Sequence, residues 1–161
     1  MWNAGNWTNM AYPSIYHAST TEELYRRIDQ LNSESQALWG KMTVGQMLSH
    51  CSVPYEQILG LNTDQPPFLM RVILNLFLKK SMVNEVPYKR NLPTAPSFIR
   101  TDAYDFENEK ARLKGYLQTI QEMGAEQLSN TPSLSLGKLS AIEWNNLLYK
   151  HIDHHLSQFS V

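Results

Sequence analysis

Residues 140–159 read SAIEWNNLLYKHIDHHLSQF, and this stretch carries the clearest helical pattern of the chain. Ser140 and Glu143 have the spacing of a capping box, in which each side chain accepts a hydrogen bond from the backbone amide of the other residue. The pattern therefore predicts a helix that begins after Ser140 and ends near Phe159. Its apolar side chains recur at helical spacing and define a buried face: Trp144, Leu147, Leu148, Ile152 and Phe159.

Three histidines lie on the same predicted helix. With Trp144 at 0° on a helical wheel, His151 falls at about 340° and His155 at about 20°. Both imidazoles therefore point into the apolar face, whereas His154, at about 280°, lies at its edge. A buried imidazole needs a partner for each ring nitrogen, so two of them on one face must share one environment.

A second helix is predicted to begin at Thr43 and to extend to about Leu59. Its apolar residues fall within a sector of about 120°, the width of a core-facing stripe. They are Val44, Met47, Leu48, Cys51, Tyr55, Ile58 and Leu59. His50 lies at the margin of this stripe and can face the interior. Pro54 predicts a kink or a frayed turn just after His50, because proline lacks the amide that would bond to the carbonyl of His50.

Capping and stop signals delimit two more helices. Thr20 and Glu23 form a capping-box pattern, which predicts a helix that starts there and ends near Asn32. A further helix is predicted from about residue 104 to residue 123. Gly124 follows it at the position where glycine commonly ends a helix in the left-handed conformation.

The most apolar segment, residues 68–78, lies within a helix predicted over residues 67–80. It is interrupted by Arg71 and Asn75, and it is shorter than the roughly 20 residues that span a bilayer. We therefore expect a buried helix of a soluble domain, and no membrane partner. Residues 81–103 contain three prolines and no periodicity, which predicts a long crossover that lets two bundle helices run in the same direction.

The composition is that of one nearly neutral domain. The 161 residues carry 14 Lys and Arg against 15 Asp and Glu, a net charge of -1, and one Cys. No nucleic-acid partner is expected, because such binding needs clustered Lys and Arg. The first residues lack the basic and apolar regions of a secretory signal, so a cytoplasmic location is expected.

We predict a single domain over residues 1–161 with an aromatic arm at residues 1–19. A disordered arm is rarely so aromatic, so the arm is expected to pack on the domain. Its aromatic residues are Trp2, Trp7, Tyr12 and Tyr16.

His50, His151 and His155 predict a site for a divalent metal. Three imidazole nitrogens that converge from two helices can hold one ion and leave a position open for water or substrate. The histidines can instead be hydrogen-bonded core residues, and this interpretation stays open. His17 is expected to be incidental, and Cys51 is expected to be a buried core residue rather than a nucleophile.

Three cationic residues, Lys89, Arg90 and Arg100, flank the predicted crossover. They can hold an anionic cosubstrate, or they can belong to a solvated loop.

Two motifs resemble those of one superfamily. Residues 39–50, WGKMTVGQMLSH, resemble the entry to the first ligand helix of DinB/YfiT-like proteins. Residues 149–159, YKHIDHHLSQF, resemble the C-terminal His-x-x-His-His-x-x-Gln signature of that superfamily. The resemblance covers most of the chain, including the segment LGKLS at residues 136–140, and is closest to a DinB-like subfamily without an assigned function.

The resemblance implies an all-α fold, namely a four-helix bundle in an up-down-down-up arrangement with a long crossover. It implies a metal held by His50, His151 and His155, with His154 as the extra histidine that precedes the last ligand. Relatives include thiol-dependent transferases and metal-dependent hydrolases. Thr131 stands where a histidine is expected ahead of the LGKLS segment, so any role of that histidine is in doubt here.

Together these observations predict a metal-dependent enzyme that binds Zn²⁺ or Ni²⁺. It would act on a small molecule as a hydrolase or as a transferase of a low-molecular-weight thiol. His154 is the candidate acid or base, or a hydrogen-bonded neighbour of the ligands. The alternatives are a non-catalytic metal-binding or stress-response bundle, and a structural bundle whose histidines bond to one another. A homodimer formed through an apolar helix face is expected.

Overall fold

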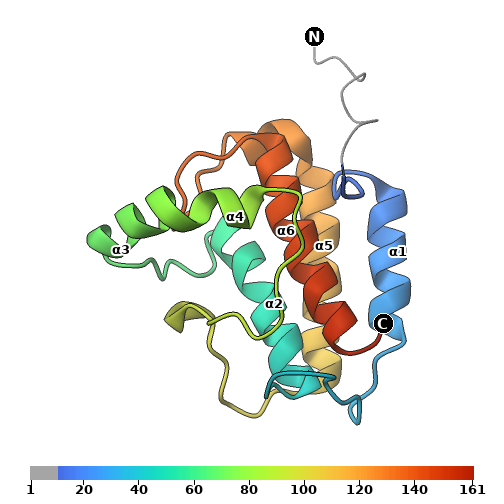
Figure 1. Ribbon diagram of the computed structural model, residues 1–161. Coiled ribbons are helices and arrows are strands. Elements are labelled where there is room, and N and C mark those ends of the chain that lie inside the picture. Colours follow the sequence, from blue (N-terminus) through green and yellow to red (C-terminus); the bar gives the residue numbers. More distant parts are fainter. Residues whose placement is uncertain (1–10) are drawn as a thin grey trace.

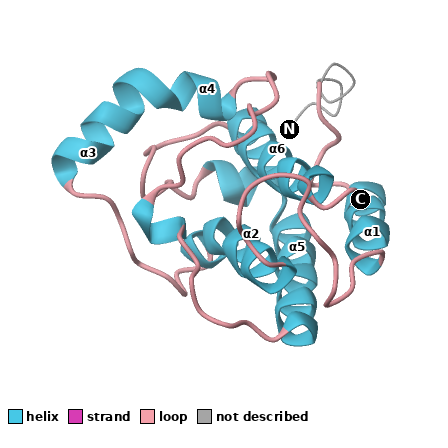
Figure 2. Cartoon of the chain, turned by 60° about the horizontal axis from the view of Figure 1, so that its bottom comes forward, coloured by secondary structure: helices cyan, strands magenta, loops and turns pink. Residues whose placement is uncertain are grey.

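The computed structural model describes residues 11–161, in which the regular structure is helical and no β-strand occurs (Figures 1 and 2). The elements are α1 (Ala18–Asp29), α2 (Val44–Ile58), α3 (Phe68–Ile73), the π-helical segment η2 (Leu74–Leu78), α4 (Lys79–Val83), the 3₁₀ turn η3 (Pro96–Phe98), α5 (Phe106–Ser129) and α6 (Ala141–Gln158). The all-α prediction is confirmed for this part of the chain. Trp2 and Trp7 of the predicted arm lie outside the described residues.

Four helices pack side by side around the core. Helix α5 contacts α1, α2 and α6, and α2 also contacts α6. Figure 1 shows α2 and α5 running in one direction and α1 and α6 running in the opposite direction. Each helix contributes apolar side chains to one buried cluster, among them Leu24, Ile28, Met47, Leu48, Leu113, Leu117, Ile120, Leu148, Ile152 and Leu156. The apolar stripes predicted for residues 43–59 and 140–159 are therefore the faces that form the core.

The two predicted capping boxes have different outcomes in the structure. At α6 the capping box is present, because Ser140 accepts from the amide of Glu143 and Glu143 accepts from the amide of Ser140. The box predicted at Thr20 and Glu23 is wrong. Helix α1 begins three residues earlier, after His17, and Thr20 is buried inside the helix instead of capping it.

The predicted interruptions at Pro54 and Gly124 do not end their helices. Helix α2 continues through Pro54 to Ile58. Gly124 has a φ of +72°, which is the left-handed conformation expected of it, but α5 resumes after this residue and ends at Ser129. Gly124 is therefore a break within α5 and not its end.

The prediction that residues 68–78 form a buried helix is wrong. Neither α3 nor η2 has a buried residue, and the side chains of Phe68, Leu69, Leu76 and Phe77 are each at least 70% exposed. Most of the segment extends away from the packed helices, although Leu74 packs against the core and α4 at its end contacts α6 (Figures 1 and 2). In the described part of the chain, no helix is both long enough and apolar enough to cross a bilayer.

After α4 the chain returns to α5 through residues 84–105, which contain only the short turn η3. A buried lysine of α6 holds the start of this crossover. The Nζ of Lys150 donates to the carbonyls of Ser81 and Asn84, at 2.9 and 2.8 Å, and to the Oδ1 of Asn84 at 3.0 Å. Lys150 is only 2% exposed, and burial lowers its pKa to about 8. Its three donors are thus matched by three oxygens, which is how a buried ammonium group is tolerated.

Replacement of this ammonium group tests its structural role. Lys150→Met keeps an unbranched side chain that is one atom shorter, but it leaves oxygens of residues 81 and 84 without their donor, so we expect a loss of about 2 to 4 kcal/mol in the free energy of unfolding. Urea unfolding measures this loss. The control is Lys138→Met, since Lys138 is exposed, and equal stability of the two variants would contradict the assignment.

Candidate metal centre

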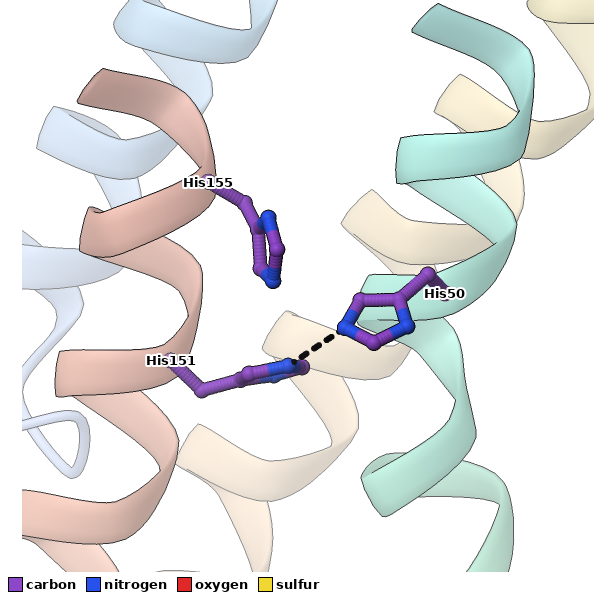
Figure 3. Close-up of side chains that lie close together, drawn as sticks. All are labelled: His50, His151 and His155. Carbon is purple, nitrogen blue, oxygen red and sulfur yellow. Dashed lines mark hydrogen bonds between the residues drawn. The ribbon is translucent and has the colours of Figure 1, made fainter. Parts of the chain in front are cut away.

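Three histidines from two helices meet at one point of the core. His50 comes from α2, and His151 and His155 come from successive turns of α6 (Figure 3). One ring nitrogen of each histidine lies within 4.8 Å of those of the other two. The Nε2 atoms of His50 and His151 are 2.9 Å apart. The predicted convergence of these three residues is therefore present, and its geometry is compatible with a metal site.

A backbone carbonyl of the crossover orients His50. The Nδ1 of His50 lies 2.9 Å from the carbonyl oxygen of Phe98, in the turn η3. Because a carbonyl only accepts, Nδ1 carries the proton and donates it, and Nε2 keeps a lone pair. That lone pair faces the other two histidines, as a metal ligand must.

A glutamine at the end of α6 orients His155. The Nδ1 of His155 lies 2.8 Å from the Oε1 of Gln158, and the Nε2 of Gln158 donates to the carbonyl of Trp39 at 2.6 Å. The Trp39 carbonyl can only accept, which fixes the amide of Gln158 with its oxygen toward the imidazole. His155 therefore donates from Nδ1 and presents an unprotonated Nε2 to the cluster.

The glycine after Trp39 makes this arrangement possible. Gly40 has a φ of +82°, and a Cβ built on it would lie 2.7 Å from the Nε2 of Gln158. The backbone conformation disfavours a larger residue, and a Cβ at this position would force the amide of Gln158 to shift. The sequence pattern assigned no role to Gly40, Gln158 or Phe98. The three-residue spacing of His155 and Gln158 on a helix could have indicated their contact.

The third histidine, His151, has no backbone carbonyl or amide oxygen of residues 11–161 hydrogen-bonded to its ring, so its tautomer depends on its contact with His50. With a lone pair on the Nε2 of His50, the hydrogen bond between the two histidines requires the proton on the Nε2 of His151. For His151 to bind a metal through Nε2 as a neutral imidazole, its proton would have to lie on Nδ1 instead. The donor set of three neutral nitrogens therefore suits a divalent ion of intermediate softness.

The environment keeps the three imidazoles neutral. Burial lowers the pKa of His50 and of His151, and it lowers the pKa of His155 from 6.5 to about 3. The charge of each imidazolium would also oppose that of its neighbours, as it does for His151 beside His50 and His155. Neutral imidazole is the form that binds a metal ion.

The remaining predicted positions lie apart from this set. His154 is half-buried at the edge, as predicted, with its ring 5.1 Å from that of His155, 5.7 Å from that of Trp39 and 5.9 Å from that of Tyr88. Its proposed acid or base role stays a prediction. His17 is exposed at the start of α1.

Cys51 is fully buried in the core, and burial raises the pKa of its thiol. It is a core residue, as predicted.

The lowered pKa values predict how the stability of the metal-free protein depends on pH. The unfolded chain binds more protons than the folded chain between the folded pKa of His155, about 3, and its ordinary value of 6.5. The free energy of unfolding should therefore fall as the pH drops below about 6.5, and this contribution should be constant above it. Urea unfolding at about pH 5.5 and about pH 7.5 measures the difference.

We expect His151→Gln to reduce this difference and His17→Gln, at an exposed position, to leave it unchanged. A pH dependence as steep in His151→Gln as in the wild type would contradict the assignment.

Comparison with known proteins identifies one family. Residues 14–161 match the family DUF1569, described as a protein of unknown function. No curated protein and no solved structure matches the chain. The matched region contains all three histidines together with Trp39, Gly40 and Gln158. Because the match spans nearly the whole chain, this protein belongs to the DUF1569 family.

Proposed function

We propose that the protein is a metal-dependent enzyme that binds one divalent ion, Zn²⁺ or Ni²⁺, through His50, His151 and His155. One observation carries this proposal: three neutral imidazoles, of which His50 and His155 are buried and His151 is half-buried, converge, and the Nδ1 atoms of two of them are held by oxygen acceptors. In histidines that bind metals, the ring nitrogen that does not bind the ion typically donates a hydrogen bond of this kind.

We further propose that the chain is a DinB/YfiT-like protein, with α1, α2, α5 and α6 as a four-helix bundle in the up-down-down-up arrangement. The contacts among these helices and their directions in Figure 1 support this assignment. So does the long connection over residues 59–105, which joins α2 to α5, two helices that run in the same direction.

A divalent ion at this site would supply Lewis-acid chemistry, lowering the pKa of a water or thiol for a hydrolase or thiol-transferase reaction. The protein's own residues supply position and environment. The Phe98 carbonyl and Gln158 fix the tautomers of His50 and His155. We propose that His154 accepts or donates a proton at the edge of the site, and its half-buried position beside His155 supports this role.

A non-catalytic metal-binding protein is the second candidate. It is favoured by the side chains that contact the three ligands in the described part of the chain, which are aromatic, amide or imidazole groups: Phe98, His154 and Gln158. No carboxylate is among them, so His154 alone would have to serve as acid or base.

Loss of any one ligand should abolish tight metal binding. We expect His50→Ala, His151→Ala and His155→Ala each to weaken Zn²⁺ binding at least about 100-fold, because each nitrogen supplies a large share of a binding free energy of about 10 kcal/mol. Competition with a chromophoric chelator, on protein purified without a nickel column, measures the affinity. The control is His17→Ala, which should bind one equivalent like the wild type.

Turnover separates the enzyme from the non-catalytic binder. The metal-loaded protein is tested with a panel of esters and amides and a panel of small thiols with electrophiles. Any turnover should disappear in His155→Ala and after removal of the metal. Turnover that survives both would refute a metal-dependent enzyme, and tight binding without turnover in either panel would favour the binder.

The contact between Gly40 and Gln158 gives a test of how His155 is oriented. Gly40→Ala should displace the amide of Gln158 and weaken Zn²⁺ binding about 10- to 100-fold, the usual effect of losing an outer hydrogen bond. Gly60→Ala is the matched control, since Gly60 has a similar positive φ of +71° but no atom within 4 Å of its added Cβ. Equal Zn²⁺ affinities in the two variants would contradict the role of Gly40.

A further inference from the structure

A first arginine lies at the edge of the histidine cluster. The guanidinium carbon of Arg90 lies 4.2 Å from the centre of the Trp39 ring. The Trp39 ring lies 5.7 Å from that of His154, which in turn lies 5.1 Å from that of His155. A cation stacked on an aromatic face keeps its N–H groups at the rim, where they can still donate. Arg90 is exposed, so these donors are accessible from solvent.

A second arginine lies next to the turn that orients His50. The Nη1 of Arg100 donates to the carbonyls of Ser97 and Ile99, at 3.1 and 2.9 Å. Phe98, between these two residues, contacts His50 with its ring at 5.7 Å and with its carbonyl at 2.9 Å. These backbone bonds hold the half-buried Arg100 in place while using only one of its nitrogens.

Neither guanidinium is neutralised by the protein. Among residues 11–161, Arg90 and Arg100 form no ion pair with a carboxylate, and residues 1–10 contain no Asp or Glu. The carboxylate of Asp153, the residue next to His154, pairs instead with Arg27 at 2.8 Å.

The unpaired charges act on the site itself. Burial is the main cause of the lowered pKa of His50 and of His154, and the charges of Arg100 and Arg90, respectively, add to it. Two positive charges therefore act on the histidine cluster: that of Arg90, which stacks on Trp39, and that of Arg100, which is bound to the backbone of the η3 turn. An anion placed between them would be attracted by both.

We propose that Arg90 and Arg100 bind an anionic group, a carboxylate or a phosphate, of the small molecule that the three-histidine site acts on. This inference rests on the proposed function, and it names the substrate class: a small molecule that carries an oxyanion beside its reactive group. Arginine suits this role because its planar fork donates two parallel hydrogen bonds to a carboxylate or phosphate.

Anion titration of the Co²⁺-loaded protein tests the proposal. The visible spectrum of Co²⁺ reports changes at the site without requiring turnover. Inorganic phosphate and acetate are the charged probes, and acetamide is the uncharged one. We expect Arg90→Gln and Arg100→Gln each to weaken binding of the preferred anion at least about tenfold, the usual effect of losing a hydrogen bond between charged groups.

Two variants serve as matched controls. Lys89→Gln removes the same charge from the residue next to Arg90, and Arg26→Gln makes the same substitution at an exposed residue of α1. Both should bind the anion like the wild type, and acetamide should not bind. All four variants should retain their Co²⁺, because none of these residues is among the proposed ligands.

The outcomes separate the two proposals. Equal anion affinity in all variants, or binding of acetamide as tight as acetate, overturns the role of the arginines. Failure of the wild type to bind Co²⁺ refutes the metal site alone, and calorimetric titration of the metal-free protein with the same anions then decides whether binding depends on the arginines. A preference for phosphate or for acetate tells which oxyanion the substrate carries.

Discussion

The packing of α2 against α6 is the contact on which the candidate site depends. His50 and His151 are separated by 101 positions in the chain, yet their Nε2 atoms lie 2.9 Å apart because the apolar faces of the two helices are buried together. A buried imidazole without a partner would oppose this packing. The Phe98 carbonyl accepts from the Nδ1 of His50, and the Gln158 amide oxygen accepts from the Nδ1 of His155. The Nε2 atoms of both histidines are left to face the cluster. The two hydrogen bonds at Nδ1 therefore satisfy the buried imidazoles, and they also leave lone pairs on Nε2 that are compatible with a metal ion.

Irregular segments complete the site, and polar contacts hold them. Lys150, one residue before His151, donates to the chain at Ser81 and Asn84 and thereby fixes the start of the crossover. The far part of that crossover supplies the carbonyl of Phe98. At the other end of the site the Trp39 carbonyl holds Gln158. Helix α6 therefore carries two of the proposed ligands and also anchors the segments that orient the ligands.

Much of this arrangement follows from patterns that can be read along the chain. Helical spacing of apolar residues identified α2 and α6, and it placed His151 and His155 on the buried face and His154 at its edge. The same pattern failed for residues 68–78, because an apolar helix is buried only if another element covers it, and here the segment extends away from the core. The capping pattern at Thr20 failed since the backbone turn at Ser14 and His17 starts the helix earlier.

The sequence by itself determined the helical class, the core-facing sides of α2 and α6 and the position of each histidine on or beside those sides, since each depends on residue type and short-range spacing. Only the tertiary structure decided what surrounds the histidines. The Phe98 carbonyl, the Trp39 carbonyl and the unpaired Arg90 and Arg100 act through contacts between distant or irregular segments. Such contacts have no period, and two of the groups are backbone atoms that every residue shares. Gly40 illustrates both cases. The glycine can be read from the sequence, but the close approach of Gln158, which disfavours a larger residue there, exists only in the folded protein.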